Sequence, residues 1–175
     1  MKLLLFIFSL FFISQSIAEE NSIEYKIKAG YLYNFTKFIT WPEDDIETFN
    51  LCVLGKDPFG SILNPIENRT VKNKSIRVYR IRSAKKTKHC HIIYGASPKQ
   101  LKRLDSNSLT ISSLPPKLTV GEARKFSRYG GMIAFFLKDG KVKLRINLGH
   151  LRKSGLDISA KLLEIAEVFE GESND

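Results

Sequence analysis

The chain has 175 residues and a formal net charge of +10 at pH 7, from 28 Lys and Arg against 18 Asp and Glu. This length, with a hydrophobic content of 43%, predicts one domain whose core is large enough to form without a structural metal. The positive charge would permit nucleic-acid binding, but the N-terminus predicts export, so we expect an anionic membrane surface or an acidic partner domain instead of nucleic acid.

The N-terminus has the pattern of a secretory signal peptide. Lys2 provides the positive start, residues 3–13 are almost entirely apolar, and small residues precede the cleavage position at Ala18. The apolar run is shorter than the roughly 20 residues that a membrane-spanning helix needs. We therefore predict that residues 1–18 are removed and that residues 19–175 form one periplasmic domain. An uncleaved N-terminal anchor is the alternative.

The first half of the mature chain predicts alternating helices and strands. Apolar residues recur every three or four positions over residues 22–38 and predict an amphipathic helix, with the stripe Ile23, Ile27, Tyr31, Phe35 and Phe38. Trp41-Pro42 ends this helix. The following segments are a strand over 50–54, a brief helix from Asp57-Pro58 to about Asn64-Pro65, a basic loop over 66–74, a strand over 75–81, a basic turn over 85–88 and a strand over 89–94.

The second half predicts a strong hairpin and a closing helix. Asp139-Gly140 joins the strands 132–137 and 141–148, which is a strong hairpin signal. The remaining predicted segments are a helix from Ser97 to about Leu104, a strand over 108–112, a helix from the capping box of Thr119 and Glu122 to about Ser127, a helical turn over 148–154 stopped by Gly155, and an amphipathic helix over 157–169.

Strands that alternate with helices indicate an α/β fold. We predict a single-domain sandwich, with a mostly parallel sheet that carries an antiparallel edge hairpin and is flanked by helices.

Two cysteines, Cys52 and Cys90, remain after removal of the signal peptide. An even number of cysteines in an oxidising compartment predicts a disulfide between them.

His89-Cys90-His91 also raises the possibility of a metal site. In a strand, the two histidines would share one face and Cys90 would face the other, and His150 is the only further histidine. We therefore expect a disulfide and no metal. The sequence contains neither a glycine-rich phosphate loop nor a nucleophile elbow, so we expect no catalytic residues, no cofactor and no enzymatic activity.

The closing helix predicts an interaction surface. Leu163 and Val168 widen its apolar stripe beyond one core-facing side, which is typical of a helix that docks onto another protein. A fully buried closing helix is the alternative. The first helix also carries more aromatic residues than a single buried stripe requires, and aromatic residues often anchor interfaces.

Several segments resemble the YfiR family of periplasmic proteins. The resemblance covers nearly the whole mature chain and rests on the order and spacing of motifs, which are Ala29-Gly30-Tyr31-Leu32-Tyr33-Asn34-Phe35, Phe38-Ile39-Thr40-Trp41-Pro42, Leu51-Cys52-Val53-Leu54-Gly55, Asp57-Pro58-Phe59, Cys90-His91-Ile92-Ile93-Tyr94, Gly130-Gly131-Met132-Ile133, Leu144-Arg145-Ile146-Asn147-Leu148 and Gly155-Leu156-Asp157-Ile158-Ser159.

This resemblance implies a regulator that binds an inner-membrane diguanylate cyclase, or another membrane sensor, and lowers cyclic-di-GMP synthesis and biofilm formation. It also implies a homodimer that responds to redox conditions. The chain departs from the family in having no further cysteine pair, so a second redox-active bridge cannot form. We expect partner contacts at Arg145, Asn147 and Arg152, although Asn147 also suits a helix cap. The competing hypothesis is a binding module for an anionic small molecule that uses the basic residues 69–74 and 85–88.

Overall fold

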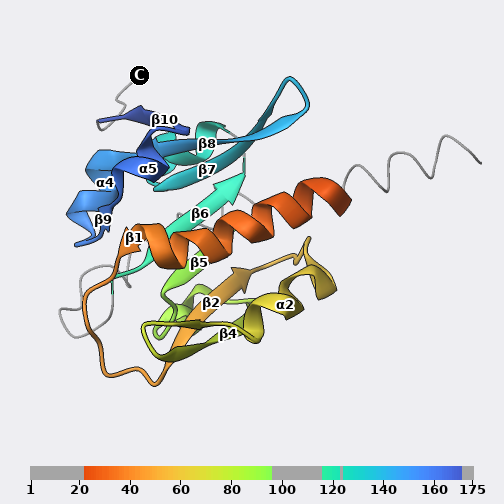
Figure 1. The fold of residues 1–175 in the computed structure, drawn as a ribbon, viewed down its shortest axis with the longest axis vertical. Helices are drawn as coiled ribbons and strands as arrows, with labels where there is room; N and C mark the ends of the chain where they lie inside the picture. Colours follow the sequence, from red (N-terminus) through yellow and green to blue (C-terminus); the bar gives the residue numbers. More distant parts are fainter. Residues whose placement is uncertain (1–21, 96–115, 123, 171–175) are drawn as a thin grey trace, which may run out of the picture.

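An eight-stranded sheet in the order β10-β8-β7-β6-β5-β2-β4-β3 runs through the computed structural model, which describes residues 22–95, 116–122 and 124–170 (Figure 1). Its strands are β2 (Thr48–Leu54), β3 (Thr70–Val71), β4 (Lys74–Ile81), β5 (Ile92–Gly95), β6 (Leu118–Glu122), β7 (Ile133–Lys138), β8 (Lys141–Asn147) and β10 (Ala166–Phe169). Most neighbours are parallel, and only β3–β4 and β7–β8 are antiparallel. The predicted α/β class with a mostly parallel sheet is confirmed.

Helical segments cover the sheet. The longest spans residues 22–38 and crosses one face between α2 and the α4–α5 region (Figure 1). The others are η1 (Gly60–Leu63), α2 (Asn64–Glu67), η2 (Ala84–Thr87), η3 (Arg124–Tyr129), α4 (Leu148–Lys153) and α5 (Ala160–Leu163). A small antiparallel pair of β1 (Ile39–Thr40) and β9 (Asp157–Ile158) ties the end of the first helix to the C-terminal segment. Within the described ranges, no helix is long and apolar enough to cross a membrane.

The alternation of the strands divides the core into two clusters. In β2, Leu51 and Val53 belong to the main cluster beneath the first helix, while Cys52 and Leu54 belong to a smaller cluster with Phe126. Successive strand residues face opposite sides of a sheet, so β2 supplies apolar side chains to both. A fully buried central strand of this kind is typical of parallel sheets covered on both faces.

The first helix buries only part of the predicted stripe, since Phe35 is in the main core and Tyr31 and Phe38 pack against it. Ile23 and Ile27 are 52% and 44% exposed. The other buried residues of this helix are Lys28, Ala29, Leu32 and Thr36. Both sets have spacings of three and four, so periodicity alone could not distinguish them. The buried set includes Lys28 because the sheet provides a carboxylate for it, as described below.

The predicted hairpin is confirmed, with Asp139 at φ 52° and Gly140 at φ 70°. Positive φ at both central residues is the geometry that suits Asp-Gly in a two-residue hairpin. Asn147 caps α4 by accepting a hydrogen bond from the His150 N–H at 3.0 Å, and Gly155 ends that segment at φ 81°, as expected.

The predicted closing helix over residues 157–169 is wrong. Only Ala160–Leu163 is helical, and Ala166–Phe169 forms β10, which pairs in parallel with β8. Val168 and Phe169 favour strands, and the open edge of β8 offers hydrogen bonds that an isolated helical turn could not match. The hairpin strand β8 is therefore covered by one further strand.

Three other local predictions also differ from the structure. Thr119 and Glu122 lie in β6 and do not cap a helix, Asn64-Pro65 begins α2 where we expected a helix to end, and the predicted strand from His89 begins only at Ile92. The loop over 66–74 contains the short strand β3. The predicted helix from Ser97 and the predicted strand over 108–112 lie outside the described residues.

Candidate functional site

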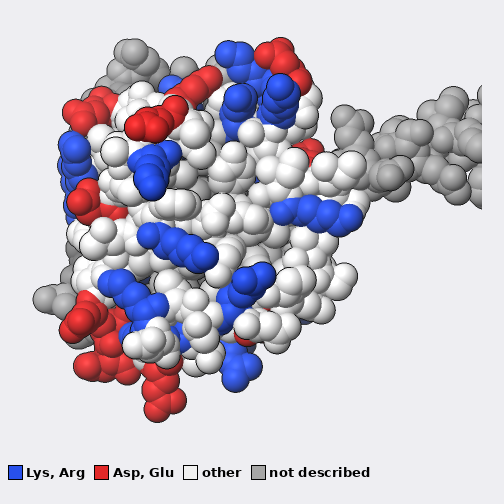
Figure 2. Space-filling view, viewed as in Figure 1, with Lys and Arg blue, Asp and Glu red and all other residues white. Residues whose placement is uncertain are grey.

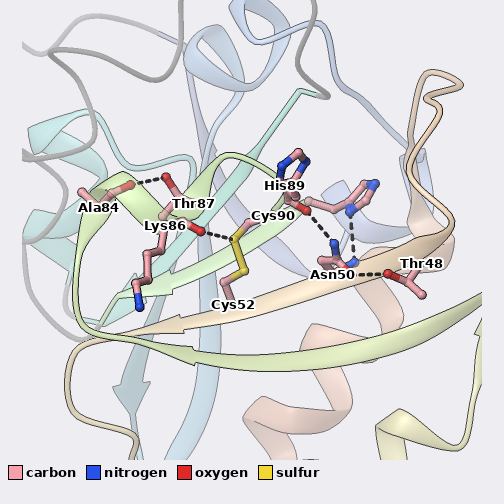
Figure 3. Close-up of a disulfide and its surroundings, with 9 residues drawn as sticks. Thr48, Asn50, Cys52, Ala84, Lys86, Thr87, His89 and Cys90 are labelled. Carbon is pink, nitrogen blue, oxygen red and sulfur yellow. Dashed lines mark hydrogen bonds between the residues drawn. A yellow bond between two sulfur atoms is a disulfide. The ribbon is translucent and has the colours of Figure 1, made fainter.

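The expected disulfide is present and joins β2 to the turn before β5 (Figure 3). Cys52 and Cys90 have Cα atoms 5.9 Å apart and are each 2% exposed, within the smaller core cluster. Asn50 holds the same turn, because its side-chain amide donates to the His89 carbonyl at 2.8 Å and its backbone N–H donates to His91 Nδ1 at 3.0 Å. The bridge is thus embedded in a hydrogen-bonded crosslink between two neighbouring strands.

His91 is a buried, neutral part of this crosslink. Since its Nδ1 accepts from Asn50, its Nε2–H donates to Asp44 at 2.9 Å. Burial lowers the pKa of His91, although Asp44 opposes that effect. Burial would raise the pKa of Asp44, but hydrogen bonds from Lys74 and His91 hold it below its ordinary value. The pair fastens the segment after Trp41 to the sheet, and a histidine in this state is a structural group.

His89 and His91 do not form a metal site together. The His89 side chain is exposed, whereas His91 is directed into the protein against Asp44. Among the residues that the structure describes, no group of three His, Cys, Asp or Glu side chains could hold a metal ion.

A buried ionic cluster fixes the first helix to the ends of β5 and β6. Lys28 is 3% exposed, and its Nζ lies 2.8 Å from Glu122 Oε1 and against Glu24. The Tyr94 hydroxyl donates to the same Glu122 oxygen. No motif in the sequence indicates this cluster, and its one signal is a lysine within a second possible apolar stripe of the helix.

The surroundings of Glu122 keep its carboxylate charged. Burial would raise the pKa of Glu122, but hydrogen bonds from Lys28 and Tyr94 and the Lys28 charge lower it. Burial and Glu122 raise the pKa of Tyr25 to about 12 and also raise that of Tyr94. Lys28, Tyr94 and Glu122 all have partners within the cluster, so its ion pairs and hydrogen bonds hold the first helix against the sheet.

Of the five predicted partner-binding residues, three lie along the edge strand β10. Arg145 stacks over the Phe169 ring at 4.6 Å, Arg152 contacts Glu170 at 3.0 Å with 60% of its side chain exposed, and Val168 is 41% exposed. Leu163 is half-buried against the main core. Asn147 is 1% exposed and caps α4, so its side chain lies inside the protein, where it has a structural role.

Two faces of the sheet meet at this edge. Leu144 and Ile146 of β8 face the main core, so Arg145 between them points to the opposite side. The register pairs Val168 with Ile146 and Glu167 with Arg145. Arg145 and Val168 therefore lie on opposite faces of the sheet, and they come together only along the exposed edge formed by β10. We call Arg145, Arg152, Val168 and Phe169 the β10 rim.

Comparison with known proteins shows a family and a distant structural likeness. Residues 25–167 match the family described as YfiR/HmsC-like. No curated protein matches the chain. Among solved structures, an ABC domain from Streptococcus pneumonia in complex with L-Trp matches with a TM-score of 0.50 and 12% identity, over 78% of this chain and 58% of that one. The chain thus spans less than two thirds of that structure, and the likeness shows the fold alone.

Proposed function

Because the chain belongs to the YfiR/HmsC-like family, we propose that it is a periplasmic regulator that binds and represses an inner-membrane diguanylate cyclase. Repression would lower cyclic-di-GMP and biofilm formation. The observation that carries this proposal is the family match, which spans residues 25–167 and so includes almost every described element. The protein would act through a surface and would need no catalytic residues.

The β10 rim is the proposed contact surface. An edge strand presents unpaired backbone groups on which another chain can add a strand. Arg145 places positive charge beside it, Arg152 lies there in an exposed ion pair with Glu170, and Val168 adds an exposed apolar side chain. This combination suits an acidic, strand-forming segment of the cyclase or, in a homodimer, a second copy of this chain.

We expect Arg152→Glu to weaken cyclase binding by about tenfold or more without unfolding the protein. The reversed charge would repel an acidic partner and would face Glu170, while an exposed ion pair contributes little to folding. The measurement is recovery of the cyclase from solubilised inner membranes with each variant as bait. Arg77→Glu is the matched control, because Arg77 is exposed on β4 near the other end of the sheet. Equal recovery with both variants would reject the β10 rim as the contact surface.

The proposed localisation has its own test. If residues 1–18 are a signal peptide, the protein in periplasmic extracts should begin at Glu19, and N-terminal sequencing would detect this. A chain that begins at Met1 in the membrane fraction would instead support the uncleaved anchor.

The second candidate function is a binding module for an anionic small molecule. Two lysines of the basic segment 69–74 are engaged within the protein, since Lys72 donates to the Trp41 carbonyl at 2.6 Å and Lys74 pairs with Asp44. Arg69 instead borders a surface groove, and this observation favours the second candidate at that position.

A further inference from the structure

A shallow groove of about 220 Å³ lies between the first helix and the η1–α2 segment. Its apolar lining consists of Ala29, Gly30, Ile62, Pro65 and Ile66. This apolar lining has no part in the proposed cyclase contact at the β10 rim. Its volume is below the roughly 300–1,000 Å³ of pockets for drug-sized ligands, so it suits a small ligand.

Positive charge surrounds this groove. Lys26, Tyr33 and Arg69 all line it. Lys37 and Arg69 lie over the Tyr33 ring at 4.4 and 5.5 Å, and a hydrogen bond with Lys37 lowers the pKa of the Tyr33 hydroxyl. None of the described residues that line the groove is acidic. Over the first helix, Figure 2 shows Lys and Arg side chains among uncharged surface, with most acidic side chains nearer the margins.

We propose that this groove binds a small amphipathic anion that has an aliphatic tail and a single carboxylate or phosphate head. The apolar lining would remove the tail from water, which is the main favourable contribution. The head would lie between Lys26 and Arg69, where the planar guanidinium can donate two parallel hydrogen bonds to either anion. The inference is independent of the cyclase and gives the second candidate function a site.

Gly30 allows the groove to be blocked without disturbing the core. A Cβ atom added at Gly30 would meet nothing within 4 Å. Glycine in a helix interior is about 1 kcal/mol less favourable than alanine, so a larger residue should not destabilise the helix. Gly30→Leu should therefore fill the groove and keep or slightly raise the melting temperature.

The test is calorimetric titration of octanoate and octyl phosphate into the protein purified after export. We expect saturable binding of one molecule per chain for at least one of them, and the tighter ligand identifies the head group. Gly30→Leu should abolish binding and Arg69→Gln should weaken it about tenfold. Arg77→Gln should bind as the wild type does, because Arg77 alternates with the core-facing Ile76 and so points to the other face of the sheet.

Three results would overturn the inference. The first is the absence of binding by both probes. The second is binding of the neutral octanamide as tightly as the better anion, since the cations would then have no role. The third is unchanged binding to Gly30→Leu, since the ligand would then lie elsewhere. None of these results depends on whether the cyclase is the partner.

Discussion

Replacing both Cys52 and Cys90 by alanine should lower the free energy of unfolding by about 4 kcal/mol. The cysteines are 38 positions apart, and the chain-entropy account of a closed loop gives this value for that length. Native domains are stable by only about 5–15 kcal/mol, so the loss would be a large part of the total. Urea denaturation of the oxidised wild type and the double variant measures the difference.

Reduction of the wild type provides a control for the lost side-chain packing, because it opens the bridge while both sulfur atoms remain. We expect the reduced protein to lose most of the same free energy. A decrease of less than about 1 kcal/mol in both experiments would show that the bridge is not a main source of stability.

Lys28→Met should cost about 3 kcal/mol at pH 7. The substitution leaves the Glu122 carboxylate without its cation, next to Tyr94 and near Glu24, and removing one partner of a buried ion pair typically costs about 3–5 kcal/mol. Glu122 keeps 29% of its side chain exposed, so we expect the lower end of that range. Lys26→Met is the matched control, because Lys26 is exposed on the same helix and should change stability by less than about 0.5 kcal/mol.

The pH dependence of this penalty follows from Glu122. Its pKa is lowered in the folded wild type, so its contribution is present above the unfolded value of about 4.3 and is lost as the pH falls through the lower, folded pKa. In Lys28→Met, burial acts on Glu122 without the Lys28 cation to oppose it, so we expect its folded pKa to lie above the unfolded value. The variant then takes up a proton at Glu122 and loses the penalty as the pH falls from 7 towards 4. The difference between the two proteins should therefore shrink as the pH is lowered from 7 towards 4. A difference that stays constant over this range would mean that packing, and not charge, accounts for the effect.

The predictions of the fold succeeded where the signal was local. Asp139-Gly140, Asn147 and Gly155 each determine their own turn or cap, and the structure confirms all three. The closing segment failed because residues 160–169 satisfy a helical period as well as a strand. Whether this segment forms a helix or a strand depends on the free edge of β8. That edge lies about 20 residues earlier in the sequence but next to β10 in the folded protein.

The functional residues were predicted less completely for the same reason. A disulfide needs only two cysteines and an oxidising compartment, so Cys52 and Cys90 could be paired from the sequence. The contacts of Lys28 with Glu122 and of His91 with Asp44 join residues 94 and 47 positions apart. An isolated charged residue in the sequence does not indicate which distant residue it pairs with. These pairs form only because the order of the strands brings the two residues together. For Asn147 the sequence left both a helix cap and a partner contact open, because the two look alike in sequence, and the structure shows the cap.

Cellular cyclic-di-GMP in a strain that lacks this protein tests the proposed function most directly. If the protein represses a diguanylate cyclase, the deletion should raise cyclic-di-GMP, and the wild-type gene should restore the original level. Arg152→Glu at the same periplasmic concentration should fail to restore it, whereas Arg77→Glu should succeed. An unchanged level in the deletion strain would contradict the proposed regulation, whatever the surface involved.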